Sequence, residues 1–349
     1  MGRAWRGVAG AAGGTVAALV WSVALAIYQP LMEPSGSWTD PQTGEQVPNM
    51  ASNNTYWPRD VRQTAILLAF AAVILLARAN LRAILVAAAG TAGWLAADLM
   101  LDRFDVSGSG TAVCLGAAAL GYVALLARLA RRLAPAEPGG ERARHFVASI
   151  LAVVGALALL LTTPYEEPVT DPALVRIENA VAGLSITLAV ACAAVVAALI
   201  RPARWSPVAT FAAVAALAGA ALAAVTASGL YAWAGALGLL TLPAAGAVAV
   251  AAARDTTWGR LLLALFAGVV LTVPAYLFVA FTGIDMGTAM TAVAADPPVN
   301  GADEDLSTAF AAALSGLLLA GLTRWLTGPA FRFREQDPAE AGPAPAPTV

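Results

Sequence analysis

The 349-residue sequence contains no lysine, and all 20 of its basic residues are arginine. A phosphate-binding P-loop needs its lysine, and a Schiff base to retinal or pyridoxal phosphate needs a side-chain amine. Both classes of protein are therefore excluded. There is one histidine, His145. Bis-histidine haem, histidine-rich zinc sites and serine-histidine or cysteine-histidine catalysis need more than this, and we expect His145 to be an interfacial residue.

Cysteine and charge are also scarce. The two cysteines, Cys114 and Cys192, lie in apolar stretches and form no CxxC motif. We expect both to be small buried apolar side chains rather than a disulfide or a redox pair. Charged residues make up 12% of the chain, whereas a soluble domain carries about 25%. The sequence therefore does not fit a soluble domain.

Apolar residues make up 59% of the chain and occur in long blocks, which are typical of membrane-spanning helices of about 20 residues. They predict an all-α, polytopic transmembrane helical bundle in a single domain, residues 1–327, followed by a disordered cytoplasmic tail, residues 328–349. The first apolar block is interpreted as an uncleaved signal anchor. The ten expected spans are residues 8–28, 61–77, 83–101, 111–126, 146–163, 177–200, 207–227, 230–253, 261–282 and 307–326.

The distribution of arginine predicts the orientation of the bundle. With ten spans, sixteen of the 20 arginines fall in turns on one side, which is therefore the cytoplasmic side. Both termini are expected there, and outer loops are expected at residues 29–60 and 283–306. Exclusive use of arginine, with much alanine and glycine, indicates a GC-rich bacterial genome and hence a bacterial cytoplasmic (inner) membrane. One inner cluster is interpreted as a topology determinant, or alternatively as a site for anionic lipid: Arg128, Arg131, Arg132, Arg142 and Arg144.

Two expected spans that run in opposite directions carry nearly the same pentad, LTLPA at residues 240–244 and LTVPA at residues 271–275. Pro243 and Pro274 each remove a backbone hydrogen bond, and Thr241 and Thr272 offer hydroxyls close by. Paired interruptions of this kind resemble the broken helices of transporter sites. The alternative is that both prolines simply bend their helices.

Two acidic residues near the outer end of the third expected span, Asp98 and Asp102, are the second candidate site. An acid in an apolar stretch is costly, and it predicts a cation or proton site paired with an arginine. The alternative is a carboxylate that reaches the outer interface. No charged residue falls at the midplane of a span, which disfavours a proton pump with a buried acidic relay.

These patterns favour a permease or transporter-like protein for a small or amphiphilic solute. The first alternative is a non-transporting assembly or scaffold subunit of a bacterial envelope complex, with the outer loops as its docking surface. A membrane enzyme that acts on a lipid-linked substrate, with Glu33 or Asp40 as its acid, is a third class, although no paired catalytic groups occur at diagnostic spacing. The sequence contains no nucleic-acid motif and predicts no cofactor, metal site or catalytic residue.

Overall fold

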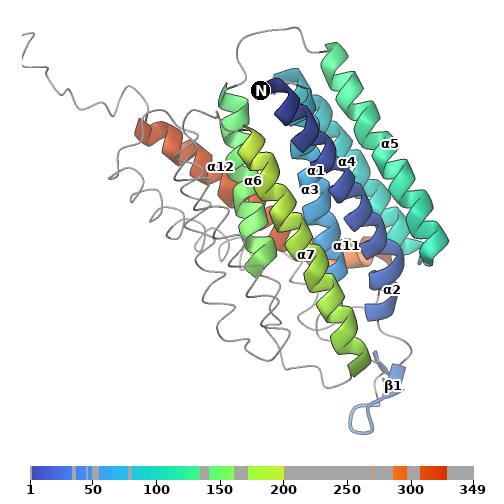
Figure 1. Ribbon diagram of the computed structural model, residues 1–349. Coiled ribbons are helices and arrows are strands. Elements are labelled where there is room, and N and C mark those ends of the chain that lie inside the picture. The colour runs from blue at the N-terminus through green and yellow to red at the C-terminus, as the bar shows by residue number, and fades with distance from the viewer. Residues whose placement is uncertain are drawn as a thin grey trace, which may run out of the picture.

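The computed structural model of this chain is a bundle of α-helices with one small β-hairpin (Figure 1). It describes residues 2–33, 37–44, 46–48, 55–77, 81–133, 141–160, 172–199, 270, 286–296 and 307–327. The prediction of a helical bundle is confirmed. Four of the described helices are long and apolar enough to cross a membrane: Trp5–Met32, Arg82–Arg103, Ser109–Leu133 and Pro172–Leu199.

The N-terminal helix is widened near its end by a π-helical turn. It consists of α1 (Gly2–Val23), η1 (Ala24–Tyr28) and α2 (Gln29–Met32). Pro30 has no N–H and so cannot donate to the carbonyl of Ala26, four residues earlier. That carbonyl instead accepts a hydrogen bond from the backbone N–H of Gly108, at 2.9 Å. The helix therefore continues past the expected end of the first span, and its last turns face the neighbouring helices.

The central helix of the bundle is α3 (Trp57–Leu76), and nearly all of its side chains are buried. Pro58 lies in its first turn, where a missing N–H costs no intrahelical bond. Because α3 is surrounded on all sides, the charged residues of its first two turns lie inside the protein. It packs against α1, α4 (Leu81–Arg103), α5 (Ser109–Leu133), α6 (Glu141–Leu160), α7 (Pro172–Leu199) and α12 (Ser307–Thr327).

Small residues let these helices approach closely. A Cβ atom on Gly316 of α12 would lie 2.5 Å from the Cα atom of Ile150 on α6, so the two backbones are in direct contact there. Gly155 of α6 packs in the same way against Cys192 of α7, which is buried as expected. Cys114 differs from its prediction because it lies on the exposed face of α5.

The core of this bundle is apolar, but its burial differs in two ways from that of a typical water-soluble protein. The side chains of Arg59 and Arg62 are fully buried, whereas Val113 on α5 is 73% exposed and Phe104 after α4 is 68% exposed. Charged residues are rarely buried in soluble proteins, and large exposed apolar surfaces need a partner or a lipid phase. The exposed faces are therefore compatible with a membrane location.

Arginines close the helix ends at one end of the bundle. Arg131 donates from Nε to the carbonyl of Leu76 at the end of α3, at 2.9 Å. Arg82 donates from Nη1 to the carbonyl of Leu133, the last residue of α5, at 3.2 Å. Cations at helix C-termini satisfy unpaired carbonyls and complement the helix dipole.

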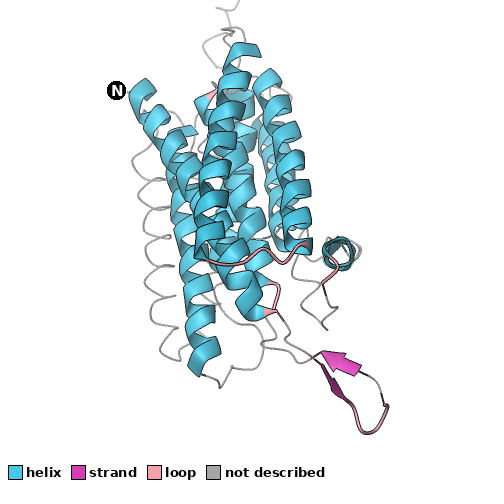
Figure 2. Ribbon diagram, turned by 90° about the vertical axis from the view of Figure 1, so that its right-hand side faces the viewer, coloured by secondary structure: helices cyan, strands magenta, loops and turns pink. Residues whose placement is uncertain are grey.

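The opposite end carries the two remaining described elements. A hairpin of β1 (Ser37–Thr39) and β2 (Gln46–Pro48) projects beyond the helices (Figures 1 and 2). The short helix α11 (Met286–Ala294) lies across the bundle and is seen along its axis in Figure 2. Both elements fall within the expected outer loops.

Candidate functional site

A cluster of charged side chains is buried where the N-terminal helix ends, α3 begins and α4 ends. Arg59 and Arg62 come from α3, three residues apart, and Asp98 and Asp102 come from α4, four residues apart. These spacings place each pair on one face of its helix. Because α3 and α4 run in opposite directions and pack against each other, the start of one meets the end of the other.

Arg62 binds both aspartates of α4. Its Nε lies 2.9 Å from Oδ1 of Asp98, and its Nη2 lies 2.6 Å from Oδ2 of Asp102. Its Nη1 donates to Oε1 of Gln29 on α2, at 3.1 Å. Nη1 and Nη2 therefore have hydrogen-bond partners, whereas Nε lies at ion-pair distance from Asp98 without hydrogen-bond geometry.

Arg59 joins the same cluster to α11. Its Nε lies 3.2 Å from Oδ2 of Asp102, so this carboxylate is shared between the two arginines. Its Nη1 donates to the hydroxyl of Thr291 at 2.7 Å, and its Nη2 forms an ion pair with Asp296. The guanidinium also stacks on the ring of Tyr56, 4.1 Å from the ring centroid.

An aromatic side chain completes the surroundings of Asp98. The indole Nε1 of Trp21 on α1 donates to Oδ1 of Asp98 at 2.7 Å. Trp21 meets the edge of Trp94, and Trp94 meets the edge of Tyr122, which in turn donates to the carbonyl of Gly90 at 2.9 Å. Asp98 of α4 is thus held by partners from two other helices, Trp21 of α1 and Arg62 of α3.

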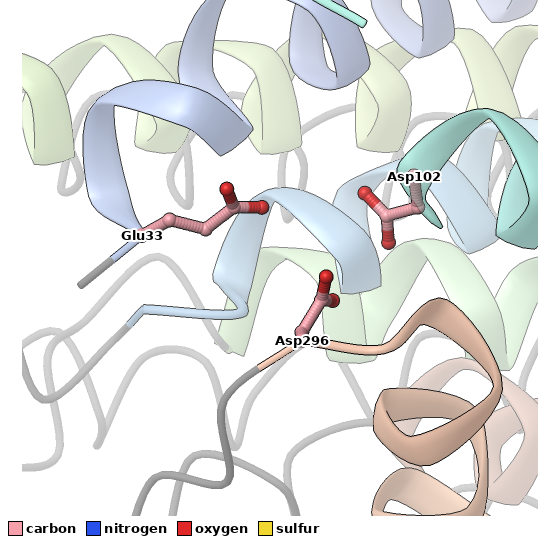
Figure 3. A group of neighbouring side chains, drawn as sticks. All are labelled: Glu33, Asp102 and Asp296. Atoms are coloured by element: carbon pink, nitrogen blue, oxygen red, sulfur yellow. The ribbon is translucent and has the colours of Figure 1, made fainter. Parts of the chain in front are cut away.

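Three carboxylates of this cluster face one another, as Figure 3 shows for Glu33, Asp102 and Asp296. One oxygen of each lies within 4.8 Å of the others. Burial raises the pKa of the Glu33 carboxyl; the Gln29 side chain opposes this shift and the negative charge of Asp102 adds to it. Carboxylate oxygens are typical ligands of Ca²⁺ and Mg²⁺. Here, however, Arg59 already pairs with two of the three, and its guanidinium supplies the positive charge that a cation would bring.

Among the described residues of the cluster, carboxylates outnumber guanidiniums. Four carboxylates, those of Glu33, Asp98, Asp102 and Asp296, surround the guanidiniums of Arg59 and Arg62. An excess of buried negative charge favours protonation of the least well paired acid. Burial raises the pKa of the Glu33 carboxyl, so this group takes up a proton more readily than an exposed glutamate does.

The predicted site residues fall in two groups. Asp98 and Asp102 both lie in the cluster and pair with arginine. The prolines and threonines of the two pentads, Thr241, Pro243, Thr272 and Pro274, lie outside the described residues, as do residues 201–250.

Arg59, Arg62 and Asp296 were missed by the sequence analysis. Arg59 and Asp296 were placed in outer loops, and Arg62 was placed at the outer end of the second expected span. Only the spacing of the two arginines behind Trp57-Pro58 could have indicated one buried helix face. His145 also differs from expectation, since it is buried and its Nε2 lies 3.3 Å from the carbonyl oxygen of Ala320 on α12.

The two acids proposed for an enzyme, Glu33 and Asp40, lie in different surroundings. Asp40 lies in the hairpin and accepts a hydrogen bond from the backbone N–H of Gln42 at 2.8 Å. That bond holds the pKa of Asp40 below its usual range, whereas a catalytic acid needs a raised pKa. Glu33 has a raised pKa but lies among the ion pairs of the cluster.

Fold and site together define a helical bundle with apolar outer faces and a buried network of arginines and carboxylates near one end. No protein-family model matches the chain, and neither a curated protein nor a solved structure is significantly similar to it.

Proposed function

We propose that this chain is a multi-pass protein of a bacterial cytoplasmic membrane, with about ten spans and both termini in the cytoplasm. Four apolar helices and the exposed apolar side chains of α4 and α5 support the membrane location. The arginine-rich end, with Arg82 and Arg131, is the cytoplasmic end, and the buried cluster lies toward the outer face.

Within this frame, the protein is a permease or transporter for a small or amphiphilic solute. The buried cluster carries this proposal, because ionisable groups inside a membrane bundle are costly and mark the paths of solutes and ions. Arg59, Arg62, Asp98 and Asp102 form the outer part of such a path. The sequence predicts kinks at Pro243 and Pro274, and we propose these as the solute site of the path.

Flux measurements test this function directly. Purified protein is reconstituted in proteoliposomes, and uptake is measured for a panel of radiolabelled carboxylates, phosphates, amino acids and amines. We expect uptake of one class, which Pro243→Ala combined with Pro274→Ala reduces by about tenfold or more. Pro338→Ala in the tail is the control and leaves uptake unchanged. Equal uptake in empty liposomes for every class, or equal flux in the double variant, contradicts the proposal.

A second candidate function is that of a non-transporting assembly or scaffold subunit of an envelope complex. The observation in its favour is the hairpin of β1 and β2, which projects beyond the helices (Figure 2). A stoichiometric partner that co-purifies with the full chain, and is lost when residues 283–306 or residues 37–48 are replaced by a Gly-Ser linker, favours this function over transport.

The arginines at the cytoplasmic end also bind anionic lipid in this proposal. Arg128 and Arg132 are exposed on the last turns of α5, in the same cluster as Arg131, Arg142 and Arg144. Native mass spectrometry of the Arg128→Gln and Arg132→Gln double variant should show fewer bound phosphatidylglycerol molecules than the wild type. An unchanged lipid count contradicts this role.

A further inference from the structure

The helix α11 contacts the bundle chiefly through small residues. Its buried residues are Gly287, Thr291 and Ala294, and the longer side chain of Met290 is half-buried, with its Sδ 3.4 Å from Nε2 of Gln63. Its other face is exposed and includes Thr288, Ala289, Ala292 and Val293. Among the described side chains of α11, Met290 and Ala294 therefore supply most of the apolar burial.

Three polar contacts from arginines of the bundle also hold α11. Arg59 binds the hydroxyl of Thr291 and the carboxylate of Asp296, which lies two residues after the end of α11. Arg103, at the end of α4, donates to the carbonyl of Val293 at 2.9 Å. Arg59 and Arg103 thus anchor α11 to the bundle.

The contacts of the Arg59 guanidinium indicate that α11 fills a binding position for another group. One edge of the guanidinium is held from within the bundle, where Nε pairs with Asp102 and Tyr56 stacks on the face. Among the described residues, the two terminal nitrogens of Arg59 contact only Thr291 of α11 and Asp296 just beyond it. A fork of two N–H groups is the geometry that recognises a carboxylate or a phosphate. The Asp296 carboxylate and the Thr291 hydroxyl therefore lie where such an oxyanion would bind.

Charge supports the same assignment. If Asp296 leaves with α11, Asp98 and Asp102 face Arg59 and Arg62 in equal number. Burial raises the pKa of Glu33, which opposes the addition of a further negative charge by this group. One anionic group bound at Arg59 then replaces the charge of Asp296, so the buried charge of the cluster is the same as before α11 left.

We propose that α11 is a displaceable latch and that the solute carries a carboxylate or phosphate group, which replaces Asp296 and Thr291 on the guanidinium of Arg59. This inference rests on the proposed permease function and names its substrate class. Asp102 and Tyr56 keep Arg59 oriented after the latch has left, so the binding fork is preformed.

Hydrogen–deuterium exchange of residues 286–296 tests the latch without any transport assay. The full chain is placed in nanodiscs of phosphatidylcholine, and exchange is followed with sodium acetate, inorganic phosphate or sodium chloride at equal ionic strength. Acetate and phosphate should speed exchange of α11 in the wild type, while chloride should not. Asp296→Asn should speed exchange on the order of tenfold without any anion, because it removes the ion pair. Asp40→Asn, which changes an exposed carboxylate outside the cluster, should behave as the wild type.

Arg59→Lys separates recognition from folding. Lysine keeps the positive charge but lacks the fork, so α11 should no longer respond to acetate or phosphate in this variant. Unchanged exchange of α11 in Asp296→Asn overturns the latch, as does an equal response to chloride. The same exchange is also measured in nanodiscs that contain phosphatidylglycerol. If this lipid speeds exchange of α11 and the soluble anions do not, the proposal that a solute displaces α11 is overturned.

The outcomes also distinguish the latch from the function on which it rests. If anions open α11 but proteoliposomes show no uptake, the binding site stands and the permease function fails. If uptake occurs but α11 does not respond to the transported solute, the function stands and the latch fails.

Discussion

At the scale of single residues, the account depends on how Arg59 and Arg62 are paired. A buried arginine is tolerated only where carboxylates and hydrogen-bond acceptors replace its water. Arg62 meets this condition through Asp98, Asp102 and Gln29. Such a pair adds little net stability over an apolar pair, but removal of one partner leaves an uncompensated buried charge.

Arg62→Met should therefore lower the free energy of unfolding in detergent micelles by about 3–5 kcal/mol. Arg62→Met combined with Asp98→Asn should cost at least about 1 kcal/mol less than the sum of the single variants, since the two groups are coupled. Arg176→Ala, an exposed arginine on α7, is the control and should change stability by at most about 0.5 kcal/mol. Additive effects of Arg62→Met and Asp98→Asn would show that these residues do not interact.

Two tryptophans of α1 offer a matched comparison. Trp21 is 4% exposed and donates to Asp98, whereas Trp5 is 53% exposed. Trp21→Phe keeps the aromatic packing but removes the donor, and should cost about 1.5–3 kcal/mol because the acceptor is charged. Trp5→Phe should cost less than about 0.5 kcal/mol in the same unfolding assay. Similar losses in both variants would contradict a hydrogen bond to Asp98.

The raised pKa of Glu33 predicts a pH dependence of stability. A group whose pKa is raised by folding stabilises the folded state below its unfolded value, about 4.5, and this contribution is lost as the pH rises through the folded pKa. Between pH 4 and pH 8 the wild type should lose stability relative to Glu33→Gln, which cannot ionise. Asp40 has a lowered pKa, so its contribution to stability is present above about pH 3.8 and is lost as the pH falls further; the difference between the wild type and Asp40→Asn should therefore change with pH only on the acid side. Parallel stability curves for the wild type and Glu33→Gln would contradict the raised pKa.

At the scale of elements, hydrophobic blocks predicted most of the described helices well. The expected spans 61–77 and 83–101 correspond to α3 (Trp57–Leu76) and α4 (Leu81–Arg103), which both extend into polar flanks. The flanks were assigned to loops because hydropathy records where apolar residues end, whereas backbone hydrogen bonds continue beyond that point. The short helix α11 was missed for a related reason, since nine residues are too few to span a membrane.

The candidate site was less predictable than the helices. Asp98 and Asp102 stood out because an acid in an apolar stretch is rare. Arg59, the partner of Asp102, lies on another helix, and its contact with Asp296 joins residues 237 positions apart. Local patterns carry no information about which helices become neighbours, so these contacts needed the fold.

Close packing of α6 against α12 gives a prediction at this scale. Gly316→Ala places a Cβ atom against the backbone of Ile150 and should cost about 1–3 kcal/mol, because neither backbone can move without shifting its helix. Gly321→Ala, on the same helix with no atom within 4 Å, should be neutral or slightly stabilising. Thermal unfolding of both variants in micelles measures the difference, and equal melting temperatures would contradict contact between α6 and α12.

At the scale of the whole molecule, the two ends of the bundle differ in chemistry. Arg82 and Arg131 close helix C-termini at one end, and the carboxylate-rich cluster with the hairpin occupies the other. The helices between them expose apolar side chains. This arrangement is the one expected if the bundle crosses a membrane with its arginine-rich end in the cytoplasm.

Cysteine labelling across α5 measures this crossing most directly. Starting from Cys114→Ser with Cys192→Ala in the full chain, single cysteines are introduced as Ser107→Cys, before α5, and as Arg132→Cys, near its end; both positions are exposed. A membrane-impermeant maleimide should label the Ser107→Cys chain in intact bacterial cells and the Arg132→Cys chain only after permeabilisation. Equal labelling of both chains in intact cells would contradict the membrane crossing on which the account depends.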